Sequence, residues 1–329
     1  MDSVTQIALG ASVAAVCVPK EHRRKAALMG AALGTLPDLD VYIDYGSAVS
    51  NFTLHRGFSH SLIVLAPFSV LLWSILKQYS RVIKEMPTAW FWAICLPLIT
   101  HPLLDAHTAY GTQLLWPLAF TPTMWSTIFI IDPLYTLPML IALITVLIAP
   151  RSMATRKTLV LGLTLSTIYL GWSWVAKYQV HQHVYRSPEV DPSEVKIFTT
   201  PTPFNTLMWR IVVLDDDEYL EGYYHFLYPD TIKFNRHQIN QPLLNEGNAI
   251  ASVKQLQWFA DSFNRADVID GYLVISDLRM GFEDNYAFRH QVARRDEDAW
   301  IPINSVRLPR QLDINDLDDF WEIFIKPIQ

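Results

Sequence analysis

The sequence predicts two structural parts: an α-helical membrane domain of about four to six helices over residues 1–176, and a small soluble α+β domain over residues 177–329. The first observation is hydropathy, because 51% of the residues are hydrophobic, only 18% are charged, and long apolar segments fill the first part. The second observation is charge. The chain has a formal net charge of −6, and the acidic excess lies in the second part, which indicates a water-soluble domain.

Apolar segments separated by short polar loops make up the first part. The helix candidates are residues 1–19, 26–36, 61–76, 88–107, 127–149 and 158–176. Alanine and glycine are frequent in the first two of these, and small residues allow helices to pack closely. The longest candidates approach the length of about 20 residues that a helix needs to cross a bilayer.

The basic residues of the first part predict its orientation. They gather in three short loops, at residues 20–25, 77–84 and 151–157. The intervening loops, 38–60 and 108–126, contain a single basic residue, Arg56. Since basic loops stay in the cytoplasm, the intervening loops, the amino terminus and everything after residue 176 are expected on the extracytoplasmic side of a bacterial inner membrane.

Strand and helix patterns alternate in the second part. Strands are expected at Leu207–Leu214, Tyr219–Tyr228, Tyr272–Ser276 and Ala287–Val292. Helices are expected at Ala249–Phe263, where apolar residues recur at helical spacing, and at Leu317–Phe324. The acidic run between the first two strands, residues 215–218, indicates a solvated hairpin turn.

Composition argues against two classes of protein. No stripe of basic residues suggests nucleic-acid binding. The two cysteines, Cys17 and Cys95, both lie in apolar segments, so neither a disulfide framework nor a thiolate metal site is expected.

Metal-binding side chains lie beside the apolar segments. His55 and His60 flank Gly57, so a turn could bring both imidazoles to one point. His101 and Asp105 are four residues apart and would share one face of a helix. Ionisable groups at membrane segments are costly and are functional by default, so we interpret these residues as parts of one site.

Carboxylates complete the candidate site. Asp38 and Asp40 are two residues apart, and in an extended backbone their side chains point the same way. Asp2 is a further candidate ligand, with capping of the first helix as its structural alternative, and His107 remains open. The predicted ligands are Asp2, Asp38, Asp40, His55, His60, His101 and Asp105. Nitrogen and oxygen ligands without thiolate suit Zn, Mn or Fe.

The order of these motifs resembles that of a known family. The motifs are Met1-Asp2, Leu36-Pro37-Asp38-Leu39-Asp40, His55-Arg56-Gly57-Phe58-Ser59-His60-Ser61, His101 with Asp105, and Tyr110-Gly111-Thr112. They resemble the bacterial inner-membrane, metal-dependent hydrolases whose founding member is regulated by the SOS repressor LexA. The resemblance implies a membrane-bound hydrolase, distantly similar to zinc phospholipase C-type enzymes, which use a His-three-residue-Asp ligand pair. The family commonly has Thr-His near the start, where this chain has Thr5-Gln6.

Residues and resemblance together predict a metal-dependent hydrolase, acting on a phosphoester at the outer face of the membrane. The ligands would hold one to three divalent metals that activate water. Asp40 would orient that water or accept its proton. Arg56 would face the anionic substrate, with anchoring to lipid phosphate as the equal alternative. The location alone suggests a phospholipid or a lipid-linked phosphoester as substrate.

Two non-enzymatic interpretations compete with this one. A small transporter would hold its ionisable groups near the middle of the membrane, whereas these gather at one face. A structural metal site anchoring an outer-face binding domain would be closed by four protein ligands. The number of candidate ligands exceeds four, which favours catalysis.

Overall fold

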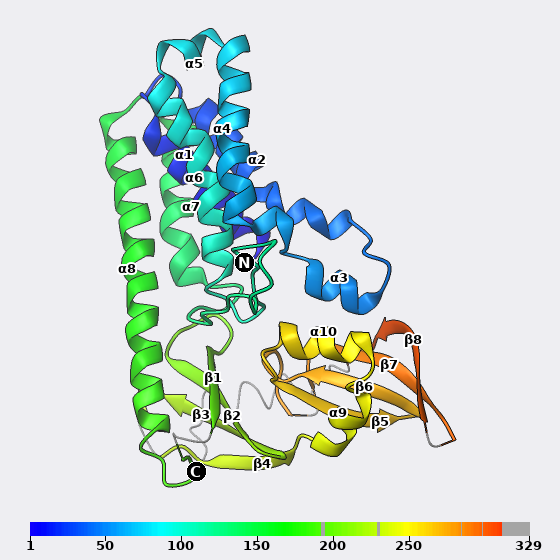
Figure 1. Ribbon diagram of the computed structural model, residues 1–329. Coiled ribbons are helices and arrows are strands. Elements are labelled where there is room, and N and C mark those ends of the chain that lie inside the picture. The colour runs from blue at the N-terminus through cyan, green and yellow to red at the C-terminus, as the bar shows by residue number, and fades with distance from the viewer. Residues whose placement is uncertain (192–194, 229–230, 284, 298, 311–329) are drawn as a thin grey trace. The chain divides into compact units, whose positions relative to one another are not determined.

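The computed structural model describes residues 1–310 except 192–194, 229–230, 284 and 298. The chain forms two compact units (Figure 1). Unit 1 consists of Met1–Ile43, Arg56–Val175 and Pro203–Asn205. Unit 2 consists of Asp44–His55, Ala176–Thr202 and the residues from Thr206 onward. The short segment Asp44–His55 therefore belongs with the later part of the chain.

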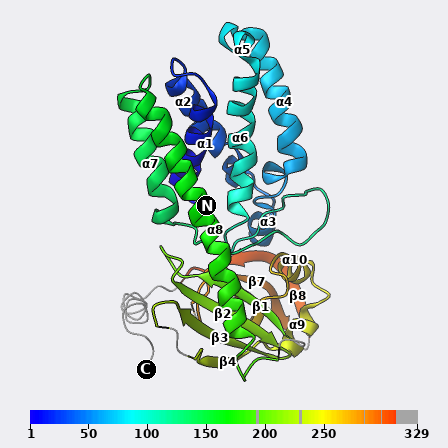
Figure 2. The same cartoon turned by 90° about the vertical axis from the view of Figure 1, so that its left-hand side faces the viewer.

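Unit 1 is helical throughout its regular structure. Its helices are α1 (Ser3–Cys17), α2 (Arg23–Thr35), η1 (Pro37–Tyr42), η2 (Phe58–His60), α4 (Leu62–Tyr79), α5 (Arg81–Glu85), α6 (Pro87–Asp105), α7 (Pro133–Ile148) and the first part of α8 (Met153–Val184). Helix α1 packs against α2, α6 and α7, and α6 also packs against α4, as Figure 2 shows. This arrangement makes α1 and α6 the central pair of the unit.

Within the described residues, three helices are long and apolar enough to cross a membrane: α4, α6 and α8. Helices α1 and α7 are shorter and also apolar. Helix α8 has 32 residues and continues to Val184, past the predicted end of the last apolar segment at residue 176. Its length exceeds what a bilayer requires.

Close contact between α1 and α2 depends on glycine. A Cβ atom at Gly10 or Gly30 would collide with the backbone carbonyl oxygen of the other residue. Gly34, one turn further along α2, approaches the backbone oxygen of Gln6 in the same way. The small residues of the first two apolar segments thus bring two backbones together, and both Gln6 and Gly34 contribute to the site described below.

Unit 2 contains two four-stranded antiparallel sheets. The first has the order β1 (Lys196–Pro201), β2 (Met208–Asp215), β3 (Glu218–His225) and β4 (Phe234–Gln238). The second has the order β5 (Asn264–Ile269), β6 (Tyr272–Asp277), β7 (Arg289–Asp296) and β8 (Ala299–Arg307). Among its described residues, the helices of this unit are α3 (Ala48–Leu54), the end of α8 from Ala176, α9 (Gln241–Gly247) and α10 (Ala251–Phe259).

A buried ion pair links the two sheets of unit 2. Arg210 on β2 donates to the Glu221 carboxylate on β3 at 2.9 Å and to the carbonyl oxygen of Leu278, directly after β6, at 2.8 Å. Because the charges are paired and hydrogen-bonded, their burial is tolerated. The same is true of the buried pair Asp277–Arg279, 2.5 Å apart.

The predicted fold class, a helical membrane domain followed by an α+β domain, is confirmed by this architecture. The four predicted strands correspond to β2, β3, β6 and β7, and the longer predicted helix corresponds to α10. Strands β1, β4, β5 and β8 were not predicted. The expected helix at Leu317–Phe324 lies outside the described residues.

Candidate metal centre

Four side chains of unit 1 converge near the end of α6. Asp38 comes from η1, His60 from η2, and His101 and Asp105 from the last turns of α6. His101 and Asp105 share a helix face because they are four residues apart. Each residue offers one ligand atom, and these four atoms all lie within 4.8 Å of one another.

Five of the six distances between the ligand atoms are close to the edges of a tetrahedron. His60 Nε2 lies 3.4 Å from Asp38 Oδ1 and 3.2 Å from Asp105 Oδ2. His101 Nε2 lies 3.4 Å from Asp38 Oδ1 and 3.6 Å from Asp105 Oδ2, and the two Nε2 atoms are 3.1 Å apart. Around a tetrahedral zinc ion with bonds of about 2.0–2.1 Å, ligand atoms are about 3.3–3.4 Å apart. One ion therefore fits among these atoms.

Burial is nearly complete. The side chains of His60, His101 and Asp105 are 0% exposed, whereas that of Asp38 is 24% exposed. Asp38 is therefore the member of the cluster that contacts solvent.

Asp105 has one oxygen held by the protein and one turned to the cluster. Its Oδ1 accepts a hydrogen bond from Gln6 Nε2 at 2.9 Å and forms an ion pair with the α-amino group of Met1. Its Oδ2 is buried and accepts no hydrogen bond from the described residues. Arg56 Nε lies 3.1 Å from it as an ion pair without a hydrogen bond, and a cation among the four ligand atoms would coordinate this oxygen.

His101 is oriented in the manner of a metal ligand. Its Nδ1 lies 2.5 Å from the carbonyl oxygen of Gly34. A carbonyl oxygen can only accept, so the ring proton is on Nδ1 and Nε2 carries the lone pair that faces the cluster. Such a second hydrogen bond is typical of metal-binding histidines.

Electrostatics favours the charged forms of Asp38 and His60, the cluster residues on η1 and η2. Burial alone raises the pKa of Asp38, but its contacts with the imidazoles of His101 and His60 outweigh it and hold the pKa far below its usual range. Burial alone lowers the pKa of His60, but Asp105 and Asp38 more than offset this effect and the pKa ends above its ordinary value. The cluster therefore attracts positive charge, whether a proton or a metal ion.

Comparison with known proteins now identifies the family. A family model described as YdjM inner membrane protein matches residues 1–180, more than half of the chain. The chain belongs to the YdjM family. It is therefore a bacterial inner membrane protein, which agrees with its three candidate spans.

A relative of this YdjM-family chain is "Uncharacterized protein YfhP" of Bacillus subtilis (strain 168). The two are 27% identical over 124 residues, which cover 36% of this chain and 37% of the relative. No solved structure matches the chain significantly.

Three of the predicted ligands are outside the cluster of the YdjM-family chain. Asp2 caps α1, because its Oδ1 accepts from the backbone N–H groups of Val4 and Thr5 at 3.0 and 3.1 Å. Asp40 is buried and accepts from Ser59 and from the backbone of Arg56. His55 belongs to unit 2.

Arg56 is buried beside Asp105. Its Nε lies 3.1 Å from Asp105 Oδ2, its Nη1 donates to Thr108 Oγ1 at 3.3 Å, and its guanidinium lies over the Tyr110 ring at 4.9 Å. These contacts place its charge next to a cluster carboxylate. The predicted roles of Arg56, towards substrate or lipid, remain predictions.

His107 has a structural environment in the YdjM-family chain. Its Nδ1 donates to the Leu103 carbonyl oxygen at 2.8 Å, and its Nε2 accepts from Trp174 Nε1 at 3.2 Å. Trp125 packs against the same ring. Both nitrogens are thus used within the protein.

Gln6 and Ser59 were quoted in the sequence motifs without a role. Gln6 donates to Asp105 and to the His101 carbonyl oxygen, so at this position the amide supports ligands instead of binding metal. Ser59 contacts both Asp40 and His60. The position of Ser59 beside His60 was the available signal, whereas the contacts of Gln6 require helix packing to be known.

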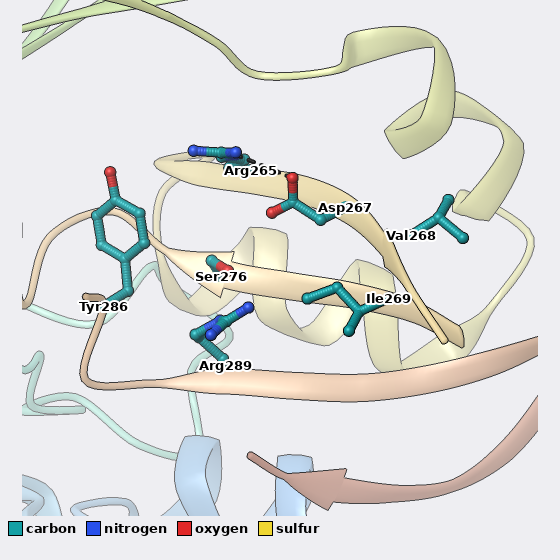
Figure 3. Close-up of a pocket in the computed structure, with 7 residues that line it drawn as sticks. All are labelled: Arg265, Asp267, Val268, Ile269, Ser276, Tyr286 and Arg289. Atoms are coloured by element: carbon teal, nitrogen blue, oxygen red, sulfur yellow. Dashed lines mark hydrogen bonds and ion pairs between the residues drawn. The ribbon is translucent and has the colours of Figure 1, made fainter. Parts of the chain in front are cut away.

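Unit 2 has a pocket of its own, of about 180 Å³. Arg265, Ser276 and Arg289 are register partners on adjacent strands and line it from one face of β5, β6 and β7 (Figure 3). Arg265 is paired with Asp267 at 3.1 Å and with Glu283 at 2.8 Å. The pocket is therefore polar and largely charge-balanced, and it is distinct in composition from the metal-competent cluster.

Proposed function

We propose that this protein is a membrane-bound, metal-dependent hydrolase that acts on a phosphoester at the outer face of the inner membrane. The observation that carries the proposal is the cluster of Asp38, His60, His101 and Asp105, in which five of the six distances between ligand atoms are 3.1–3.6 Å. A divalent ion held there would activate water and stabilise an anionic leaving oxygen. Zn is the favoured metal, with Mn and Fe as alternatives, because the ligands are nitrogen and oxygen.

The protein's own residues would divide the remaining tasks. Asp38 is the partly exposed member of the cluster, so we place the substrate on its side. Gln6 would hold Asp105, and the Gly34 carbonyl oxygen would hold His101. Arg56 compensates the negative charge of Asp105 and, being always protonated, would also favour an anionic substrate nearby.

The proposed orientation follows from the basic loops, which the positive-inside rule assigns to the cytoplasm. The loops that contain Asp38 and His60, the end of α6 and unit 2 would then be extracytoplasmic. A phospholipid or lipid-linked phosphoester is the proposed substrate class, because such molecules present a phosphoester at a membrane face.

Metal analysis combined with hydrolysis assays tests the proposal. Detergent-purified wild type should bind about one equivalent of Zn or Mn, and His60→Ala and Asp105→Asn should each lose most of it, because a metal needs its full set of deprotonated ligands. His22→Ala, outside the cluster, is the matched control. Phosphomonoesters, phosphodiesters and phospholipids should then be assayed with metal-loaded wild type. If reconstituted wild type binds no metal, the proposal is wrong.

A structural metal site is the second candidate, and one observation favours it. The four side chains account for all corners of a tetrahedron, as in closed structural zinc sites. In that case wild type would bind metal, the two variants would lose thermal stability, and no substrate of the panel would be hydrolysed. Metal-dependent hydrolysis that is lost in Asp105→Asn would instead support the hydrolase over a structural metal site.

A further inference from the structure

We infer that Asp40 and Ser59 are positioning residues: they form a hydrogen-bonded chain that holds the His60 proton on Nδ1 and so presents Nε2 to the metal. The inference rests on the metal site of the proposed function. It changes the role of Asp40, which the sequence suggested as a ligand or a proton acceptor.

The contacts of the chain run from the carboxylate to the ring. Ser59 Oγ lies 2.6 Å from Asp40 Oδ2 and 2.9 Å from His60 Nδ1. Asp40 Oδ2 also accepts from the backbone N–H of Arg56 at 2.9 Å. Asp40 is 4% exposed and His60 is fully buried, so bulk water does not compete effectively for these hydrogen bonds.

The direction of each hydrogen bond follows from the number of protons. An ionised carboxylate only accepts, and a serine hydroxyl has one proton. Ser59 therefore donates to Asp40, and its oxygen is left to accept from His60. The His60 ring must supply that proton from Nδ1, which leaves the lone pair on Nε2.

This assignment creates a demand for a cation. His101 also carries its proton on Nδ1, because it faces the Gly34 carbonyl oxygen. The two Nε2 atoms are 3.1 Å apart, and neither neutral ring has a proton to place between them. Two lone pairs at this distance repel unless a metal ion or an additional proton lies between them, with Asp38 and Asp105 closing the other corners.

The backbone of the segment is shaped to make these contacts. Arg56 has a φ of 62°, a left-handed conformation that is unfavourable for a residue with a side chain. The turn aims the Arg56 N–H at Asp40 Oδ2. It is followed by η2, which carries both Ser59 and His60. The hydrogen bond from the Arg56 N–H to Asp40 thus offsets part of the energetic cost of the left-handed conformation.

Metal affinity of the full-length protein in detergent tests the inference without requiring turnover. Ser59→Ala and Asp40→Ala should each weaken Zn or Mn binding about 10- to 100-fold, the usual effect of losing a residue that supports a metal-binding histidine. Ser59→Thr keeps the hydroxyl and should bind close to wild type. Ser74→Ala, on the exposed part of α4, is the control. Unchanged affinity in Ser59→Ala, or a Ser59→Thr variant as weak as Ser59→Ala, would overturn the inference.

Histidine ¹⁵N NMR separates this inference from the metal site itself. In metal-free protein at about pH 9, above the ordinary pKa of histidine, His60 should show a proton on Nδ1, and Ser59→Ala should lose that preference. If wild type shows this tautomer and binds no metal, the proposed function is wrong, but the hydrogen bonds from His60 through Ser59 to Asp40 are confirmed. If wild type binds metal while metal-free His60 carries its proton on Nε2, the inferred role of Asp40 and Ser59 is wrong, but the metal site is confirmed.

Discussion

Asp38, Asp40 and Asp105 show how differently three carboxylates of one region are used. Asp105 has one oxygen held by Gln6 and one aimed at the cluster. Asp38 Oδ1 lies 3.4 Å from the Nε2 atom of each imidazole, and its side chain is partly exposed. Asp40 bonds to Ser59 and to a backbone N–H. Residue type and proximity in sequence could not distinguish these roles, because each depends on which donor the fold places opposite each oxygen.

Because His290 is buried in the second sheet, we expect the stability of unit 2 to depend on pH. Burial, and then the nearby charge of Arg307, lower its pKa to about 4, with Asp277 opposing. Neither ring nitrogen has a hydrogen-bond partner among the described residues. Since the unfolded chain binds a proton near the ordinary value of 6.5, the stabilisation is complete above pH 6.5 and is lost as the pH falls towards 4. The difference corresponds to about 3 kcal/mol.

Hydrogen exchange of β6 and β7, followed from pH 7 to pH 4.5 and corrected for intrinsic exchange rates, measures this effect. Protection should decrease over that range in wild type. His290→Phe removes the titrating group while keeping an aromatic ring, and it should flatten the dependence. Equal loss of protection in both proteins would contradict the assignment to His290.

At the scale of elements, the pair α1–α2 supports the cluster. Gln6 on α1 holds Asp105, Gly34 on α2 holds His101, and the glycines at positions 10, 30 and 34 let these helices touch. The metal-competent residues lie on η1, η2 and α6, so their geometry depends on a helix contact to which they do not belong.

Gly30→Ala should destabilise unit 1 by about 1–3 kcal/mol, the usual cost of overpacking. The added methyl group would meet backbone atoms of Gly10, which cannot move as a side chain can. Thermal unfolding in detergent measures the effect. Gly171→Ala on α8 is the matched control, because a Cβ atom there has nothing within 4 Å. A melting temperature of Gly30→Ala equal to that of the control would contradict the packing argument.

At the scale of the whole molecule, the candidate spans and basic loops predict a topology. We expect a reporter fused after residue 180 to be extracytoplasmic, because three basic loops alternate with loops that contain only Arg56. Fusions of alkaline phosphatase and of green fluorescent protein at this position measure the side directly. The same fusions in the loop at residues 77–84 provide the opposite control. Fluorescence without phosphatase activity after residue 180 would reverse the orientation.

The sequence predicts those strands and helices whose own residues show a clear pattern of apolar and polar side chains. Strands β2 and β6 are largely buried, and β2, β3, β6 and β7 all matched predicted strands. Strands β4 and β8 were missed because their residues are mostly exposed, and edge strands lack a clear apolar pattern. The end of α8 was missed because polar residues can continue a helix that apolar spacing no longer marks.

The candidate site likewise has features that local sequence predicts and features that it does not. The pairing of His101 with Asp105 follows from helical spacing alone. The choice of His60 over His55 does not, because it depends on the left-handed turn at Arg56. The support from Gln6 and Gly34 depends on contact between helices that are far apart from α6 in sequence. Local periodicity cannot encode such contacts.

The order in which the cluster residues occur along the chain has a consequence for biosynthesis. Asp38 and His60 emerge from the ribosome well before His101 and Asp105, and no segment contains all four. A nascent chain that has completed α4 can offer a metal only half of the cluster. Metal loading would therefore have to wait until α6 is synthesised and packed, so a bound ion would report that the first half of the protein has been assembled.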